Sequence, residues 1–278
     1  MLLRLNTVKW GRGTPTAFML HGLGDGAFVW NHIAPVLAVR DTVVAVELRG
    51  HGDSPHDPQA RYEFRTYAED VLATIESCAG QCSVSLIGHS LGAIVAIHVA
   101  SLARKQVRGL ALVDGGPGMD PATTEYMRQQ FLTQPWFYDS VAPFVAELQR
   151  RYPLSDPQLL ERMAQHALRC LPVGGYELKC DRRLLSATGA PDDELLWRKL
   201  KSFDGPALVI RGAGSAMLGR KAAKRMANEL PDCRLHTVSG AGHAVMLDNP
   251  DAFLLATKTF LHEMARNSCA RKEVHSST

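Results

Sequence analysis

The stretch Val84-Ser85-Leu86-Ile87-Gly88-His89-Ser90-Leu91-Gly92-Ala93-Ile94-Val95-Ala96 joins a β-prone run, a serine between two glycines, and a run of small and aliphatic residues. The pattern G-x-S-x-G between a buried strand and a helix predicts a sharp turn that exposes the serine hydroxyl. Gly88 and Gly92 let the strand and helix backbones pass closely. The turn also places Ser90 at a helix N-terminus, whose free N–H groups can stabilise an oxyanion. Ser90 is therefore predicted to be a nucleophile, and the alternative is a turn serine without chemistry.

Length and composition indicate an α/β protein with a substantial core. The chain has 278 residues, which fits one large α/β domain or two small ones, and 46% of them are hydrophobic. The formal net charge is only +3, and charged residues make up 21% of the chain. This charge is too small and too dispersed to favour nucleic acid or a membrane surface as a partner.

The cysteines and the N-terminus indicate a protein of a reducing compartment. The six cysteines are scattered and include no metal-type C-x-x-C pair, so we expect free thiols. The first residues contain no apolar core of a signal peptide. Apolar runs are much shorter than a membrane span. We therefore expect a cytoplasmic protein without a membrane span.

Buried strands and helices alternate along most of the chain. Short apolar strands are expected before Ser90 and at Thr16–Leu20, Thr42–Leu48, Val107–Val113, Ala207–Arg211 and Cys233–Val238. Helical patterns separate them, and the last helix is expected at Pro250–Met264. Near-continuous apolar strands of this kind are typical of a mostly parallel sheet that is covered on both faces.

The alternation breaks between residues 118 and 202, where helical segments occur without a clear strand. An insertion after the carboxyl end of a strand would lie over the ligand crevice of the sheet. The expected organisation is a core of residues 1–117 and 203–268, a helical cap of residues 118–202, and a flexible tail of residues 269–278. Trp136, Phe137 and Tyr138 could form an apolar pocket wall or the core of the cap.

A serine nucleophile needs a base, and the base needs an acid that orients it. Among eleven histidines, His243 stands out because it lies in a glycine-rich loop after the last strand. His89 is adjacent to Ser90 and is expected to point away from the serine hydroxyl, in a packing or supporting position. His21 precedes the glycine-rich stretch Gly22–Gly26 and is expected to hold its shape.

Several stretches in the same order resemble the α/β-hydrolase superfamily, in its branch of capped serine esterases and lipases. They are His21–Gly24, Glu47–Ser54, Gly88–Gly92, Gly240–His243 and Leu247–Pro250. The resemblance covers nearly the whole chain except the insertion. It implies the order Ser, acid, His, which supports His243 as the base. It also implies that Leu23 and Leu91 donate the two backbone N–H groups of an oxyanion hole.

The acid departs from the common pattern of this family. The usual acid follows the strand expected at Ala207–Arg211, where this chain has Gly212-Ala213-Gly214-Ser215. Some family members place the acid one strand earlier, directly after the strand that follows the nucleophile's helix. Here that strand ends at Val113, and the position is Asp114. We therefore expect Asp114 to orient His243. Two alternatives remain: Asp114 only stabilises the turn at Gly115–Gly116, or a Ser–His dyad works with Ser215 or water.

A substrate pocket is expected between the loop and the cap, lined by His21, Gly24, His89, Trp136, Phe137 and Tyr138. Asp25 and Gly26 lie beside the oxyanion loop and could also contact substrate. The glycines lack the spacing of a phosphate-binding loop. The histidines do not pair with an acid at metal-ligand spacing. No cofactor and no metal are expected.

The expected function is a serine hydrolase that cleaves a small or medium carboxylic ester, lactone or thioester through an acyl-enzyme. One alternative is C–C bond hydrolysis, or a lyase or cyclase step, with the same serine and histidine. Another is a homologue that binds a ligand without turnover. The expected partner is a small-molecule substrate, and the protein is expected to be a monomer or a homodimer.

Overall fold

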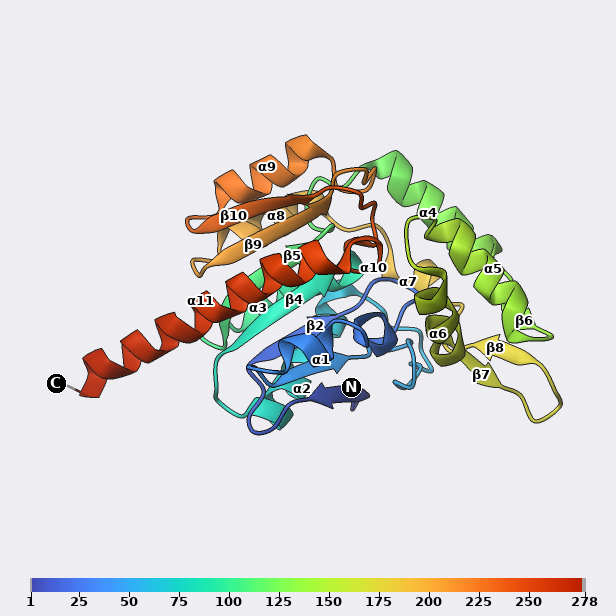
Figure 1. Cartoon of the computed structure of the whole chain (residues 1–278), viewed down its shortest axis with the longest axis horizontal. Coiled ribbons are helices and arrows are strands. Elements are labelled where there is room, and N and C mark those ends of the chain that lie inside the picture. Colours follow the sequence, from blue (N-terminus) through green and yellow to red (C-terminus); the bar gives the residue numbers. More distant parts are fainter. Residues whose placement is uncertain (1, 277–278) are drawn as a thin grey trace.

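A seven-stranded sheet forms the centre of the molecule (Figure 1), which we describe from a computed structural model of residues 2–276. The strand order is β1-β3-β2-β4-β5-β9-β10. The bounds are β1 Thr7–Trp10, β2 Ala17–Leu20, β3 Val43–Val46, β4 Val84–His89, β5 Val107–Val113, β9 Ala207–Gly212 and β10 Cys233–Val238. Only β1 is antiparallel to its neighbour β3, and the other pairs are parallel. The expected mostly parallel sheet is therefore confirmed.

The strands are buried because helices cover both faces of the sheet. Every residue of β2, β3, β4 and β9 is buried, which explains their near-continuous apolar sequences. One layer is formed by α2, Phe64–Ala79; α3, Leu91–Leu102; α8, Asp193–Lys201; and α9, Arg220–Glu229, which contact one another in succession. The other layer contains α1, Ala34–Leu37, and α11, Pro250–Ser276 (Figure 1).

Residues between β5 and α8 form a group of elements beside the sheet, at the right of Figure 1. The helices are α4 Pro121–Thr133, α5 Val141–Arg151, α6 Pro157–Ala167 and α7 Leu184–Thr188. The strands are β6 Phe137–Tyr138, β7 Leu168–Cys170 and β8 Tyr176–Leu178, which form a small antiparallel sheet. We refer to residues 118–190 as the cap. The prediction of a strand-free insertion was wrong here, because strands of two or three residues are too short for any periodicity to be visible.

Two boundaries differ from the expected ones. Helix α8 lies within the predicted insertion but packs against α3 and α9, so it belongs to the helical layer of the main sheet. Lys199 of α8 donates a hydrogen bond to Ser101 Oγ of the adjoining α3, at 3.3 Å. Helix α11 continues to Ser276, beyond the expected end at Met264. The flexibility of residues 269–278 stays a prediction, and residues 277–278 lie outside the described part.

The cap is attached to the core by a polar network at its second junction. Asp181 N–H donates to Gly50 O at 2.7 Å, and Tyr62 Oη donates to Asp181 Oδ2 at 2.6 Å. Arg183 forms an ion pair with Asp181 at 2.6 Å and donates to Asp57 O at 3.0 Å. These contacts fix the chain that leaves β8 against the loop after β3.

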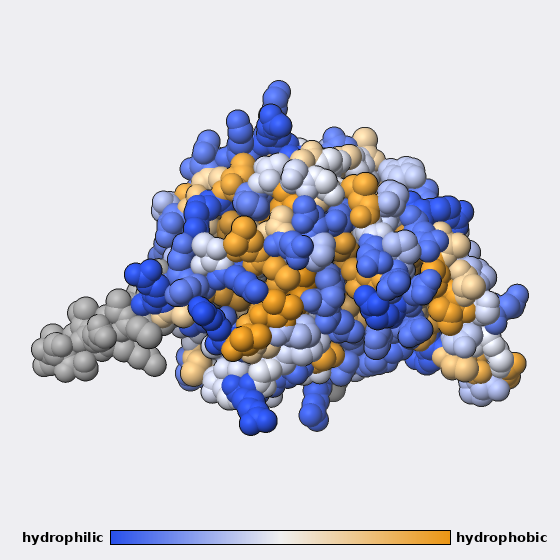
Figure 2. All heavy atoms as spheres, in the orientation of Figure 1, coloured by the Kyte–Doolittle hydropathy of each residue, from blue (hydrophilic) through white to orange (hydrophobic). Residues whose placement is uncertain are grey.

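Hydrophilic and apolar side chains are mixed on the face shown in Figure 2. Apolar side chains gather in the middle of this face, where Figure 1 places α1 and α11. Val36, Val39 and Leu255 are exposed on or beside these helices. Within residues 2–276, no helix is long and apolar enough to cross a membrane.

Candidate active site

Ser90 occupies a strained turn between β4 and α3. Its φ of +52° lies in the left-handed region, which is unfavourable for a residue with a side chain. The turn is possible because its neighbours lack side chains: a Cβ on Gly92 would lie 2.4 Å from Leu20 O, and one on Gly88 would lie 2.2 Å from Gly92 O. The backbones of β2, β4 and α3 therefore approach one another closely, and Ser90 projects from the end of the strand.

Asp114 follows the neighbouring strand β5 in a second strained position. Its φ is +44°, and its side chain is fully buried. The N–H of Gly212, at the end of β9, donates to Asp114 Oδ1 at 3.2 Å. Strands β5 and β9 are paired, with Val113 opposite Ile210, so the ends of both strands meet at the same edge.

His243 connects Asp114 with Ser90. Its Nδ1 donates to Asp114 Oδ2 at 2.7 Å, and its Nε2 lies 3.0 Å from Ser90 Oγ. Because Nδ1 carries the hydrogen in the contact with Asp114, Nε2 is left as the acceptor for the Ser90 hydroxyl. The imidazole is 22% exposed, so a substrate can reach it, whereas Asp114 is shielded from solvent. The arrangement has the geometry of a serine nucleophile, a base and an orienting acid.

Ser215 completes the surroundings of the acid. It lies in the turn after β9, where the family resemblance implies the usual acid, and its hydroxyl donates to Asp114 Oδ2. Its Oγ accepts a hydrogen bond from Met217 N–H at 3.1 Å, which fixes the direction of the donated hydrogen. Asp114 Oδ2 thus accepts from both His243 and Ser215.

Asp248 supports the loop that carries His243. Its Oδ2 accepts from Gly242 N–H at 2.8 Å, and its Oδ1 accepts from Ser155 Oγ at 2.6 Å. Ser155 lies between α5 and α6, so Asp248 links the base loop with the cap. At the start of α11, which Asp248 precedes, it is Asn249 whose Oδ1 accepts from Ala252 N–H, at 3.1 Å.

The two predicted oxyanion donors follow the paired strands β2 and β4. Leu91 is the first residue of α3, and the first N–H groups of a helix have no partner within the helix. Leu23 lies in the turn after β2, and the backbone hydrogen bonds of loops in the described part include none from its N–H. Both groups are therefore available for a substrate oxygen.

His21 supports the oxyanion loop and does not contact Ser90. Its Nε2 accepts from Leu48 N–H at 3.0 Å, and its Nδ1 donates to Gly22 O at 2.8 Å. Burial lowers the pKa of His21, so the neutral form that these two bonds require is favoured. The expectation that His21 holds the loop agrees with these contacts.

His89 packs beside His243. Its Nε2 donates to His243 O at 2.9 Å, and the two rings are 4.7 Å apart between centroids. Burial lowers the pKa of His89 well below its usual range, and the adjacent His243 lowers it further. A neutral His89 therefore positions the backbone of His243.

The cap aromatics that the sequence suggested lie in two different places. Trp136 packs edge-on against Phe131, with ring centroids 5.3 Å apart. Phe131 in turn lies 3.0 Å from the position of a Cβ on Gly24, so Phe131 covers the oxyanion loop. Sequence reasoning missed Phe131, because only the fold shows that α4 crosses this loop.

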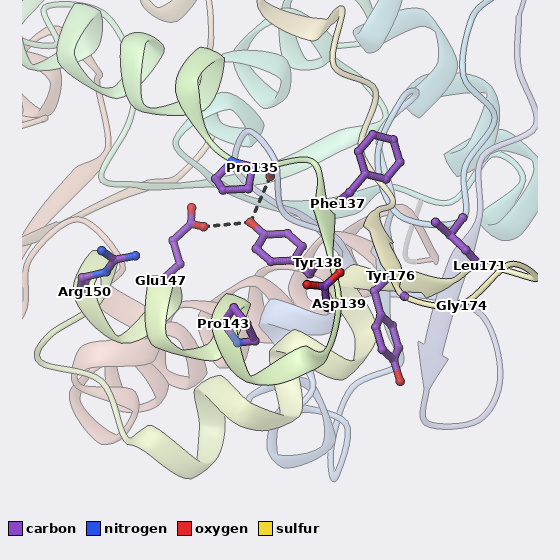
Figure 3. Close-up of a pocket in the computed structure, with 11 residues that line it drawn as sticks. Pro135, Phe137, Tyr138, Asp139, Pro143, Glu147, Arg150, Leu171, Gly174 and Tyr176 are labelled. Atoms are coloured by element: carbon purple, nitrogen blue, oxygen red, sulfur yellow. Dashed lines mark hydrogen bonds between the residues drawn. The ribbon is translucent and has the colours of Figure 1, made fainter.

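Phe137 and Tyr138 lie elsewhere. They line a cavity of about 440 Å³ between β6, β8 and α5, and its lining includes neither Ser90 nor His243 (Figure 3). Tyr138 Oη donates to Glu147 Oε2 at 2.9 Å, and Phe137 is 55% exposed. Their predicted contact with substrate stays a prediction. In the described part of the chain, no group of three or more His, Cys, Asp or Glu residues could hold a metal ion.

Comparisons with known proteins agree with this geometry. The family model described as "Alpha/beta hydrolase family" matches residues 17–256. The chain is 26% identical to 2-(acetamidomethylene)succinate hydrolase of Mesorhizobium japonicum, over 93% of this chain and 92% of the relative. It is 27% identical to a pimeloyl-[acyl-carrier protein] methyl ester esterase of Chromobacterium violaceum, over 92% and 97% of the two chains.

A solved structure supports the same grouping. The crystal structure of E-2-(acetamidomethylene)succinate hydrolase superposes with a TM-score of 0.84 and 25% identity, over 93% of this chain and 95% of that one. The chain therefore belongs to the alpha/beta hydrolase family. It is a hydrolase by this membership, since its relatives are named esterases and hydrolases.

Proposed function

We propose that the protein hydrolyses a small-molecule carboxylic ester, lactone or thioester through an acyl-enzyme on Ser90. The single observation that carries this proposal is the continuous hydrogen-bond chain from Asp114 through His243 to Ser90 Oγ, with distances of 2.7 and 3.0 Å. The esterase names of several relatives support an ester as the substrate.

The first half of the reaction forms the acyl-enzyme. Ser90 Oγ attacks the substrate carbonyl while His243 Nε2 takes its proton. The N–H groups of Leu23 and Leu91 stabilise the negative charge on the carbonyl oxygen. His243 then gives its proton to the leaving alcohol or thiol, and the C–O or C–S bond breaks. Asp114 keeps His243 in the required tautomer and stabilises the imidazolium.

The second half releases the acid. His243 takes a proton from water, which attacks the acyl carbonyl, and the tetrahedral intermediate again places its oxygen between the two N–H groups. His243 returns the proton to Ser90 Oγ when the acyl–serine bond breaks. Both half-reactions use only the chain's own residues, the substrate and water.

Covalent labelling tests the nucleophile. We expect a fluorophosphonate to add once to the protein, with the added mass on the peptide that contains Ser90, and Ser90→Ala to remain unlabelled. A panel of p-nitrophenyl esters of increasing acyl length then measures ester hydrolysis directly. An unlabelled wild-type protein that binds ligands tightly would instead favour a homologue without turnover.

A further inference from the structure

Asp25 carries a carboxylate without a partner beside the oxyanion loop. It ends the turn that begins at Gly22, whose carbonyl accepts from Asp25 N–H at 3.3 Å. Within residues 2–276, no hydrogen bond or ion pair reaches the Asp25 carboxylate. A carboxylate that is partly removed from water and has no hydrogen-bond partner lowers the free energy of unfolding. A ligand that supplies the missing partner explains its presence better than a structural role.

The groups that face Asp25 come from the cap and from the base loop. Two groups, Arg151 and His243, influence the charge of Asp25. Asp25 in turn influences the ionisation of Tyr152 and Cys180. Burial raises the pKa of Asp25 to about 6, and Arg151 and His243 oppose this only in part. Near neutral pH the carboxylate is therefore mostly ionised and accepts hydrogen bonds.

Arg151 does not satisfy this carboxylate directly. Its Nη2 donates to Glu147 Oε1 at 2.9 Å and to Gln134 Oε1 at 3.0 Å, so the guanidinium is held by partners in the cap. Glu147 also accepts from Tyr138, as Figure 3 shows. The positive charge of Arg151 is thus already balanced by Glu147, and Asp25 retains its capacity to accept.

His89 supplies a second unpaired acceptor at the same place. Its Nε2–H is used by His243 O, so Nδ1 is a lone pair. This Nδ1 is buried and has no partner among the described residues, and His89 is only 3% exposed. Both His89 Nδ1 and Asp25 Oδ2 lie 3.0 Å from the position that a Cβ on Gly22 would take, so the two acceptors cannot be farther apart than twice that distance.

We propose that Asp25 and His89 Nδ1 form a subsite that selects substrates with a hydrogen-bond donor, a hydroxyl or N–H group, on the acyl chain near the reacting carbonyl. The inference rests on the proposed ester hydrolysis at Ser90. Two unpaired acceptors this close to each other favour a donor, which could pair with either of them. A plain alkyl group leaves both acceptors unpaired, and a carboxylate or ether oxygen adds a third acceptor.

Matched esters test the subsite. The substrates are p-nitrophenyl butyrate, its 2- and 3-hydroxy derivatives, and the corresponding methoxy derivatives, which keep the oxygen but cannot donate. We expect the wild type to prefer at least one hydroxy ester over both its methoxy and unsubstituted counterparts by about 10- to 100-fold in kcat/KM. Asp25→Asn should lose most of this preference. Asp204→Asn, on the exposed surface, is the matched control and should keep it.

A second readout separates this inference from the proposed function. Ser90→Ala cannot form an acyl-enzyme, so calorimetry with the methyl esters of the same acids measures binding alone. We expect the favoured hydroxy ester to bind about tenfold or more tightly than its methoxy counterpart, and Asp25→Asn in the Ser90→Ala background to remove the difference. Equal binding of hydroxy and methoxy esters, or a preference that survives Asp25→Asn, overturns the subsite. Selective binding without turnover by the wild type would contradict only the hydrolase proposal.

Discussion

Ser215 donates its hydroxyl hydrogen to Asp114, and the accepting oxygen is the one that also receives Nδ1–H of His243. The turn after β9, which holds the acid in many members of the family, therefore supplies a hydrogen-bond donor to an acid that follows β5. The turn at the family's usual acid position thus takes part in the hydrogen-bond network that joins Asp114 and His243.

The position of the acid leads to a swap prediction. Asp114→Asn should lower kcat about 10³- to 10⁴-fold, because His243 loses the partner that fixes its tautomer. The double variant Asp114→Asn/Ser215→Asp should recover at least about tenfold of this loss, because a carboxylate returns to the same oxygen network. Turnover of p-nitrophenyl butyrate measures both. An Asp114→Asn protein with near-full activity, beside an inactive Ser90→Ala, would show that Asp114 is not the acid.

The contacts of Asp248 predict a difference between two variants. Asp248→Ala leaves Gly242 N–H and Ser155 Oγ without their acceptors, so we expect kcat to fall about tenfold and unfolding free energy to fall by about 1–3 kcal/mol. Ser155→Ala removes only the contact with the cap and should change kcat less than about threefold. Steady-state kinetics and urea unfolding measure the two effects. A larger effect of Ser155→Ala on kcat would contradict this ordering.

The raised pKa of Asp25 predicts a stability change of defined sign. Its pKa is about 6 in the folded protein against an ordinary value of 3.8, so the unfolded chain releases this proton at lower pH. The contribution of Asp25 to stability therefore falls as pH rises from about 4 to about 6 and stays low above that range. Asp25→Asn should stabilise the protein by about 2 kcal/mol at pH 7.5 and by less at pH 4.5.

Thermal unfolding at the two pH values, with Asp204→Asn as the reference, measures this difference. A variant that loses substrate selectivity while gaining stability is the signature of a functional residue. A lower melting temperature of Asp25→Asn at pH 7.5 would show that the Asp25 carboxylate stabilises the fold.

The close approach at Gly92 predicts a strongly destabilised variant. A Cβ there would lie 2.4 Å from the carbonyl oxygen of Leu20, and neither backbone can move without disturbing β2 or α3. Gly92→Ala should cost about 3 kcal/mol or more of unfolding free energy. Gly219→Ala is the control, because a Cβ at Gly219 meets nothing within 4 Å, and its effect should stay within about 1 kcal/mol. Similar melting temperatures of the two variants would refute the packing argument.

The main sheet and the turn at Ser90 could be predicted because their signals are local. Apolar runs separated by helical patterns specify buried parallel strands, and Gly88 with Gly92 marks a strand that turns sharply into a helix. The alignment of Ser90, Asp114 and His243 agrees with the order expected for the family, and their catalytic roles stay a proposal. The strands β6 to β8 escaped prediction, because two or three residues carry no period.

The contacts between cap and core could not be predicted from the sequence. Phe131 reaches Gly24, and Ser155 reaches Asp248, across 107 and 93 positions of the chain. Such pairs depend on how α4 and the α5–α6 connection settle on the sheet, and no local pattern encodes that placement. The unpaired acceptors at Asp25 and His89 became visible only when every neighbouring donor could be placed.

The pairing of β5 with β9 has a consequence for how the acid can change strands during evolution. Val113 lies opposite Ile210, so the turns that follow the two strands are adjacent: Asp114 contacts His243, and Ser215 contacts Asp114. An exchange of the carboxylate between the two turns involves two substitutions, one at Asp114 and one at Ser215. The order of these substitutions decides which intermediate protein occurs. One order passes through a protein with two carboxylates in contact, where like charges repel. The other passes through a protein with neither, which retains only a Ser–His pair and is expected to be a weak catalyst.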